Sequence, residues 1–182
     1  IRLIDPNGED IEVVQNKDKT YTITGGTLNK DNNIYIMQDG KRTGEILGQT
    51  LTPYSFFSSD NKVVVGANIN PNDNSGQNFF DKEIANGKID LIQYIGNARG
   101  GQKYDFKTRG MNENRGKITV AQYMYRGMLF KDNHGHTFFA SARDIGNYSA
   151  GYIAGVSGQT WGASRKAFDA LESLQNKAFS TE

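Results

Sequence analysis

The segment 143–158, with the sequence R-D-I-G-N-Y-S-A-G-Y-I-A-G-V-S-G, constrains the fold more than any other stretch. Its larger apolar residues recur at helical spacing from Ile145 to Val156, which predicts a helix with one apolar stripe. The remaining face consists of small residues. Because each glycine costs roughly 1 kcal/mol against alanine inside a helix, we expect another element to pack closely against that face. The segment therefore predicts a buried central helix. The small residues are Gly146, Ala150, Gly151, Ala154 and Gly155.

Polar residues gather at the start of this helix. Asp144 directly precedes the apolar stripe, where its carboxylate can cap the free N–H groups of the first turn. Arg143 and Asn147 flank it. Two interpretations stay open at this point. Either these side chains only cap and anchor the helix, or they face a ligand, since a helix N-terminus favours anions.

Charge and composition narrow the classes of function. The chain has 182 residues, enough for one domain with a hydrophobic core. Its formal net charge is +1, so no overall field attracts nucleic acid or an anionic membrane. Cysteine is absent, which excludes disulfides, thiolate metal ligands and a cysteine nucleophile. No apolar run approaches the ~20 residues that cross a bilayer, so we expect no membrane insertion.

The order of patterns predicts an α+β fold in one domain over residues 15–182. Residues 15–70 are β-rich, with strands at Thr20–Thr24 and Ile34–Met37 and a hairpin turn at Asp39-Gly40. Two short helices are expected within residues 79–96, at Phe79–Ala85 and Ile89–Ile95, after a loop over Asn70–Asn78. The site is expected in the region 100–178, which closes with an amphipathic helix over Trp161–Ala178.

A β-hairpin is expected to lead into the central helix. Residues 118–130 read as a strand, 132–135 as a turn and 137–140 as the partner strand. His134 and His136 flank this turn. An exposed pair is the simpler interpretation, although histidine is also the usual general acid–base near neutral pH. An H-x-H pair in a strand places both rings on one face, as a metal site would need, but only Asp132 and Asp144 could add a third ligand nearby, so we expect neither a metal nor another cofactor.

The segment 100–110 places charged side chains among aromatic ones. In an extended conformation Asp105 and Lys107 point to one face, while Tyr104 and Phe106 point to the other. One interpretation is a solvated turn with an ion pair that contributes little. The other makes the carboxylate and the ammonium part of a site, with the aromatic rings buried as anchors.

Two motifs resemble known families. The D-P-N-G sequence within Ile4–Gly8 resembles the end of the Rhs/YD-repeat core, whose shell-forming proteins carry variable toxin domains behind D-P-x-G. We therefore expect residues 1–14 to be the end of such a core and a linker strand, and the chain to be part of a longer protein.

Residues 100–174 resemble the C-terminal domains of polymorphic toxins, nearest to the toxin family numbered forty-four. The shared features are Gly101 with Tyr104-Asp105-Phe106-Lys107, and the later Gly146-Asn147-Tyr148-Ser149-Ala150-Gly151. That family commonly has tryptophan where this chain has Tyr104. The resemblance implies a secreted effector, delivered from a producer bacterium into or onto a target cell, and a cognate immunity protein. Ribonuclease activity has been suggested for such toxins.

The leading hypothesis is a metal-independent ribonuclease. Such an enzyme needs a base for the 2′-OH, an acid for the leaving oxygen and cations for the phosphorane. The catalytic candidates are Asp105, Lys107, His134, His136, Arg143 and Asp144. The substrate-binding candidates are Tyr104, Arg109, Arg126, Asn147 and Tyr148.

Two alternatives come from other classes. A toxin that cleaves peptidoglycan or another polysaccharide would need paired carboxylates, for which Asp105 and Asp144 are the candidates. The near-zero net charge counts mildly against nucleic acid as the substrate, because phosphate contacts dominate affinity for nucleic acid. The other alternative is a non-catalytic domain of an Rhs-family protein that binds a partner or remains part of the shell.

Overall fold

A curled mixed sheet organises the chain. The structure is a computed structural model that describes residues 10–28, 30–114, 116–132 and 134–158. Its seven strands lie in the order β4-β3-β1-β2-β5-β6-β7, which together with the helices confirms the predicted α+β class. The strands are β1 (Asp10–Gln15), β2 (Tyr21–Thr27), β3 (Asn33–Gln38), β4 (Lys41–Gln49), β5 (Asn68–Asn70), β6 (Gly127–Lys131) and β7 (Thr137–Ser141).

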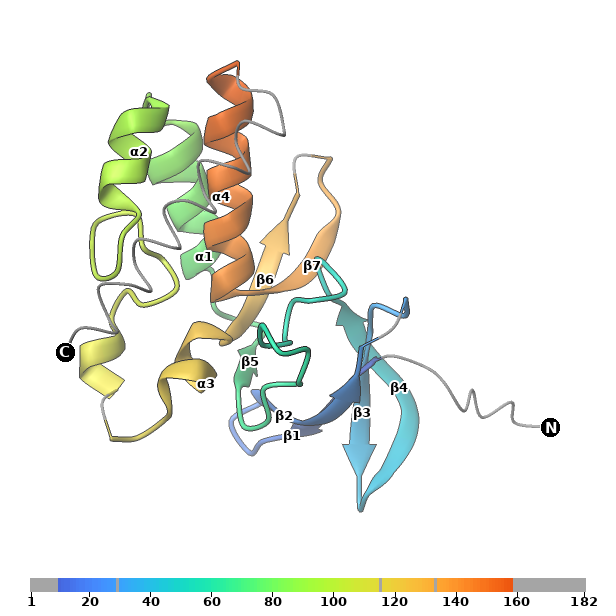
Figure 1. Ribbon diagram of the computed structural model, residues 1–182. Helices are drawn as coiled ribbons and strands as arrows, with labels where there is room; N and C mark the ends of the chain where they lie inside the picture. The colour runs from blue at the N-terminus through green and yellow to red at the C-terminus, as the bar shows by residue number, and fades with distance from the viewer. Residues whose placement is uncertain (1–9, 29, 115, 133, 159–182) are drawn as a thin grey trace.

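Three of the helices gather at one end of the molecule. Figure 1 shows α1, α2 and α4 side by side next to the β6–β7 hairpin, with β1 to β4 at the opposite end. The helices are α1 (Ser75–Asn78), the π-helix η1 (Phe79–Ala85), α2 (Leu91–Asn97), the 3-10 helix η2 (Met111–Asn114), α3 (Val120–Met124) and α4 (Ala142–Val156). Within the described ranges no helix has the length and apolar character that a bilayer crossing requires.

The strands follow from alternating apolar residues. The predicted strands at 20–24 and 34–37 are confirmed as β2 and β3. In β1 the inward residues Ile11 and Val13 are buried, as alternation requires. The predicted turn at Asp39-Gly40 is also confirmed: both residues have positive φ, 51° and 72°, the conformation of a type I′ hairpin turn.

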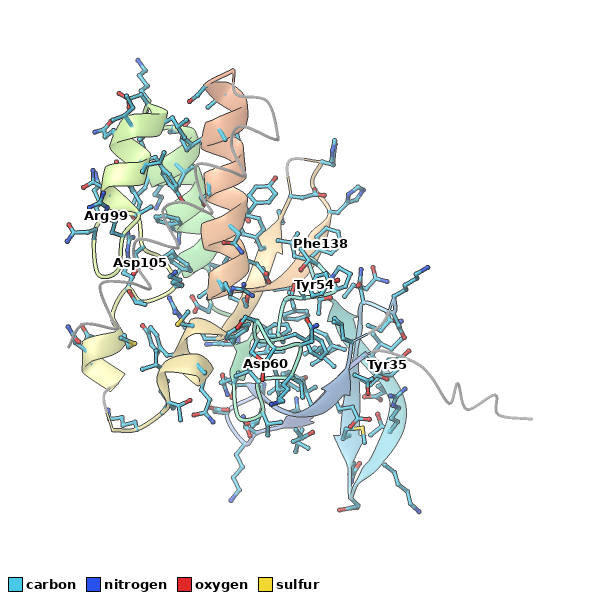
Figure 2. All side chains as sticks on the ribbon, viewed as in Figure 1. Tyr35, Tyr54, Asp60, Arg99, Asp105 and Phe138 are labelled. Atoms are coloured by element: carbon cyan, nitrogen blue, oxygen red, sulfur yellow. The ribbon has the colours of Figure 1, made fainter. Side chains whose placement is uncertain are left out.

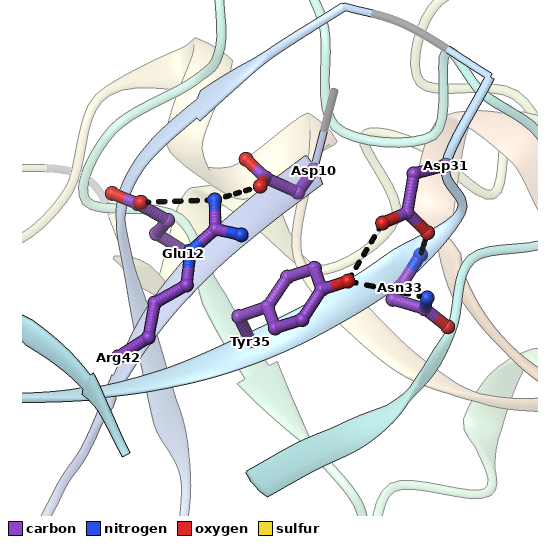
Figure 3. A network of polar contacts seen from close by, with 6 residues as sticks. All are labelled: Asp10, Glu12, Asp31, Asn33, Tyr35 and Arg42. Atoms are coloured by element: carbon purple, nitrogen blue, oxygen red, sulfur yellow. Dashed lines mark hydrogen bonds and ion pairs between the residues drawn. The ribbon is translucent and has the colours of Figure 1, made fainter. Parts of the chain in front are cut away.

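A polar network fixes three strands against one another (Figure 3). The Arg42 guanidinium of β4 donates to the buried Asp10 carboxylate at the start of β1 and, at 3.4 Å, to Glu12. It also lies 4.3 Å from the ring centroid of Tyr35 in β3. The Tyr35 hydroxyl donates in turn to Asp31 at 2.7 Å. This network therefore supports the parallel β1–β3 pairing from the β4 side.

The two edges of the sheet meet. Thr50, just after β4, forms a parallel bridge with Phe139 of β7, and the Leu51 N–H donates to the Phe139 carbonyl at 2.9 Å. A Cβ on Gly48 would lie 2.8 Å from the Phe139 ring, so the close approach requires glycine there. The chain after β4 is thereby held beside β7 and the start of α4.

The β6–β7 hairpin separates two apolar cores. Because β7 alternates, Phe139 faces the core inside the curled sheet, while Ala140 faces the core under the helices. The sheet core includes Ile23 and Phe56, both fully buried. The helix core includes Ile145, which joins α4 to α1 and η1. The hairpin thus positions the start of α4 relative to the sheet.

Three local predictions need correction. The expected strand over 118–130 is confirmed only for its last residues, 127–130, which belong to β6, because Thr119 and Gln122 form a capping box that starts α3 before it. The expected loop over Asn70–Asn78 ends earlier, where α1 begins at Ser75. The predicted helix at 79–85 is present as a π-helix, and the next one runs over Leu91–Asn97. The D-P-N-G motif and the closing helix at 161–178 lie outside the described residues.

The central helix exists, but its environment differs from the expectation. Ser141, not Asp144, is the N-cap of α4, and Asp144 is the third residue of its capping box. The buried face runs through Ile145, Ser149 and Ile153. A Cβ added at Gly146, Gly151 or Gly155 would meet no described atom within 4 Å. The expected close packing on that small-residue face is therefore not found among the described residues. Close packing occurs at Gly76 instead.

Two alanine substitutions test this assignment. Gly76→Ala is expected to lower the free energy of unfolding by about 1–3 kcal/mol, because its methyl group would overlap Ile145 and the Met128 sulfur, the latter 2.8 Å away. Gly151→Ala is expected to raise it by about 0.5–1 kcal/mol, because only the conformational cost of glycine is removed. Urea unfolding measures both. A loss of stability at Gly151 would reveal close packing on the small-residue face.

Candidate functional site

An open pocket of about 800 Å³ lies where the loop after β4 faces the start of α4. Such a volume falls within the ~300–1,000 Å³ of typical small-molecule sites. Tyr54 of the loop and Phe138 of β7 lie close together to the right of the lower part of α4 in Figure 2, and both line the pocket. The lining residues used below are Tyr54, Ser58, Asn61, Asp132, Phe138, Arg143, Asp144, Asn147 and Tyr148.

A tight turn forms the loop wall of the pocket. The Ser55 N–H donates to the Thr52 carbonyl, and the Phe57 N–H donates to the Tyr54 carbonyl, each at 3.1 Å. Ser55 and Phe56 are buried, which anchors the turn to the sheet core. Tyr54 is 56% exposed. The turn therefore holds one aromatic ring at the rim of the pocket on a fixed backbone.

The Asp144 carboxyl group lies at the base of α4. Its Oδ2 accepts the Ser141 N–H at 2.9 Å, and its own N–H donates to the Ser141 hydroxyl at 3.1 Å. Burial raises the pKa of Asp144 to about 6, although hydrogen bonds from Ser141 and Ser55 and the charge of Arg143 oppose that rise. A buried carboxyl group with such a pKa, lining a pocket, can exchange a proton near neutral pH.

A second acid–base pair stands beside the pocket. The Nδ1 atom of His136 lies 3.2 Å from Oδ2 of Asp132, which lines the pocket. The His136 ring also meets Phe138 edge-on, with centroids 6.3 Å apart. Partial burial raises the pKa of Asp132, but the backbone N–H groups of His136 and His134 and the His136 ring outweigh it, so the net pKa is lowered. His134 lies outside the pocket lining.

Three further candidates from α4 reach the pocket. Within the described residues Arg143 donates one hydrogen bond, to the Tyr125 hydroxyl at 3.1 Å, and its other guanidinium N–H groups have no partner there. Asn147 is exposed, and its amide makes no hydrogen bond within the described part of the chain. Tyr148 is held by Phe80 and Phe130, whose ring centroids each lie 5.1 Å from its own.

The segment 100–110 is apart from this pocket and folds differently from the expectation. Figure 2 places Asp105 on the α2 side of the molecule, away from Tyr54 and Phe138. The segment is a series of turns, not an extended strand. The buried Asp105 carboxylate accepts the Gly101 N–H at 2.8 Å and the Thr108 hydroxyl, so it organises those turns. Asp105 and Asp144 therefore do not share a pocket.

The aromatic and basic neighbours of Asp105 also have partners within the fold. Tyr104 is buried and stacks on Tyr94, with centroids 5.6 Å apart. Lys107 is half-buried and lies outside the pocket lining. Arg109 pairs with Glu83 at 2.6 Å. These contacts stabilise the region between α2 and α3.

The Arg126 guanidinium is engaged in contacts within the fold. Its guanidinium donates to the Phe106 and Lys107 carbonyls, each at 2.9 Å, and packs on the Tyr123 ring at 4.3 Å. Burial lowers its pKa. A phosphate would have to displace these carbonyls to reach it.

Sequence reasoning brought together Arg143, Asp144, Asn147 and Tyr148, and missed the opposite wall. Tyr54 was visible only as part of an aromatic run with no assigned structure. Asp132 was expected as a turn residue and as a possible further ligand beside the two histidines, not as the partner of His136 in a pocket. The remaining signal was the H-x-H motif over 134–136, which does not by itself identify that partner.

Neither a metal-binding cluster among the described residues nor a similar known protein helps to interpret this pocket. Among the described residues no group of three or more His, Cys, Asp or Glu side chains is placed to hold a metal ion. Comparisons with protein-family profiles, curated proteins and solved structures find no match to this chain. The site must therefore be interpreted from its own residues.

Replacing Asp144 with asparagine should remove a pH dependence of stability. The folded pKa of about 6 exceeds the ordinary 3.8, so the folded chain binds this proton more tightly than the unfolded chain. The contribution is fully present below the ordinary pKa and is lost as the pH rises through about 6, by ~3 kcal/mol in all. Urea unfolding of both proteins at about pH 4 and about pH 8 measures the change. A stability difference independent of pH would contradict the raised pKa.

Proposed function

We propose that this chain is the toxin domain of a secreted Rhs-type effector, and that it cleaves RNA at the pocket beside α4. The observation that carries the proposal is that one pocket is lined by Asp144, with its raised pKa, by Arg143, which has guanidinium donors without a described partner, and by Asp132, which contacts the His136 ring beside the pocket. These supply the acid, the cation and the base that RNA transesterification needs. The resemblance to polymorphic toxins adds the delivery route and a cognate immunity protein.

The proposed reaction uses two proton transfers. His136, oriented by Asp132, removes the proton from a 2′-OH as that oxygen attacks the adjacent phosphorus. The bond from phosphorus to the 5′ oxygen breaks, and protonated Asp144 gives its proton to that leaving oxygen. Arg143 offsets the negative charge that develops on the phosphorane. The products are a 2′,3′-cyclic phosphate and a 5′-OH.

A second candidate function rests on a different observation. Asp132 and Asp144 both line the pocket, and the pKa of one is lowered while that of the other is raised to about 6. Two carboxyl groups with opposite shifts are the arrangement of glycoside hydrolases, in which one acts as acid and the other as base or nucleophile. On this alternative the substrate is a cell-wall glycan, and Asp132 replaces Asp105 as the partner of Asp144.

Ribonuclease activity of the purified chain tests the proposal. His136→Ala is expected to lower kcat/KM on RNA by about 10²–10⁴-fold, because the base is lost. Arg143→Ala is expected to lower it by about 10²–10³-fold, because the phosphorane loses its cation. His134→Ala is the matched comparison: neither histidine ring is part of the pocket lining, but only the His136 ring contacts Asp132 among the described residues, whereas His134 contacts it through its backbone N–H. A larger loss in His134→Ala than in His136→Ala would overturn the assignment of the base.

Expression in bacteria separates the classes of target. A ribonuclease is expected to stop growth in the cytoplasm, and the growth arrest should be relieved by His136→Ala. Killing only when the chain is exported, with peptidoglycan cleaved in vitro and RNA left intact, would replace the proposal by the second candidate. Harmless expression in both compartments, with no hydrolysis in vitro, would leave a binding domain.

A further inference from the structure

Tyr54 is the most exposed aromatic residue among those that line the pocket. Its side chain is 56% exposed, whereas Phe57 in the same turn is 3% exposed. Its hydroxyl makes no hydrogen bond within the described residues. The turn that carries it is fixed at both ends, by the Thr52 hydroxyl, which accepts the Tyr54 N–H at 3.2 Å, and by the Phe57 N–H. The Tyr54 ring is therefore fixed neither by burial in a core nor by a hydrogen bond from its hydroxyl to a described residue.

Two side-chain amides that line the same pocket have no hydrogen-bond partner among the described residues. In the turn over Ser58–Lys62 the Asn61 backbone has a φ of 59° and its N–H donates to the Ser58 carbonyl, but its side-chain amide makes no hydrogen bond to a described residue. The Asn147 amide on the opposite wall is likewise without a described partner. An amide carries both donors and an acceptor, so it can read the edge of a heterocycle. An exposed ring that lines one pocket with two such amides fits a planar, polar-edged ligand.

We propose that Tyr54 is a specificity-determining residue that stacks one base of a single-stranded RNA, with Asn61 and Asn147 facing the edge of that base. This inference rests on the proposed ribonuclease function and adds the substrate class. A base inside a duplex is covered on both faces by its neighbours, so only an unpaired base can lie flat on a side chain held at a pocket rim. Stacking on an aromatic side chain tolerates any base, because every base has a π-face.

The test uses the full chain and two short RNA probes. The first is a fluorescein-labelled single-stranded oligonucleotide, offered as the cleavable RNA and as its 2′-O-methyl form, which lacks the attacking hydroxyl. The second is the same sequence annealed to its complement. Tyr54→Ala is expected to raise KM on the single strand roughly 10- to 100-fold with kcat little changed, and to weaken binding of the 2′-O-methyl strand by the same factor. The duplex is expected to be a poor substrate for the wild type.

Two controls keep the result specific to the ring. Tyr54→Phe keeps the aromatic face and should retain wild-type KM. Ile92→Ala removes another exposed apolar side chain, 84% exposed and outside the pocket, and should change neither KM nor binding. An unchanged KM in Tyr54→Ala, a fall confined to kcat, or equal cleavage of the duplex would overturn the inference while leaving the ribonuclease proposal intact.

The experiment can contradict the stacking inference and the ribonuclease proposal separately. If the wild type cleaves no RNA but binds the 2′-O-methyl strand in a Tyr54-dependent way, the ribonuclease proposal falls and the stacking inference stands. If it neither cleaves RNA nor binds the 2′-O-methyl strand, both fall. A pocket that instead binds chitooligosaccharide through Tyr54 would overturn the RNA assignment and favour the glycan alternative.

Discussion

The backbone contact between Leu51 and Phe139 determines where the pocket forms. Without it the loop after β4 would have no fixed relation to the β6–β7 hairpin, because β4 and β7 are at opposite ends of the strand order. The contact brings the two edges of the sheet together, and the turn that follows is then placed over the start of α4. Gly48 permits the approach by leaving room for the Phe139 ring. One wall of the pocket thus depends on a pairing between segments almost ninety residues apart, Leu51 and Phe139.

The capping box of α4 links folding to the proposed chemistry. Asp144 begins the helix with Ser141, and the same burial that makes this cap useful raises the pKa of its carboxyl group to about 6. The two interpretations of the polar residues at this helix are therefore compatible. A residue that caps a helix inside a pocket keeps a fixed orientation, and its proton is weakly held near neutral pH. The same raised pKa that lets Asp144 donate a proton near neutral pH also means that the folded chain loses stability when this carboxyl group ionises.

Local signals predicted the elements better than they predicted the site. Strands β2 and β3 follow from alternation, and the turn at Asp39-Gly40 follows from its dipeptide. The strand expected over 118–130 failed because β-branched and aromatic residues there concealed the Thr119 capping box. The polar residues of α4 could be found because they are adjacent in sequence. Tyr54 could not, since the contact that places it is non-local. Asp105 does not lie beside Lys107 on one face of an extended segment as expected, because residues 100–110 form turns.

The charges of the pocket set a limit on how RNA could be bound there. The lining contains one guanidinium, from Arg143, and two carboxyl groups, from Asp132 and Asp144. With an overall charge of +1, the chain has no general field to compensate for them. The two other arginines expected to bind substrate are engaged elsewhere: Arg109 pairs with Glu83, and Arg126 donates to backbone carbonyls. Phosphate contacts alone would then give little affinity, because each contributes through counterion release. Affinity must come instead from the uncharged groups at the rim, which is a physical reason for an aromatic ring at that position.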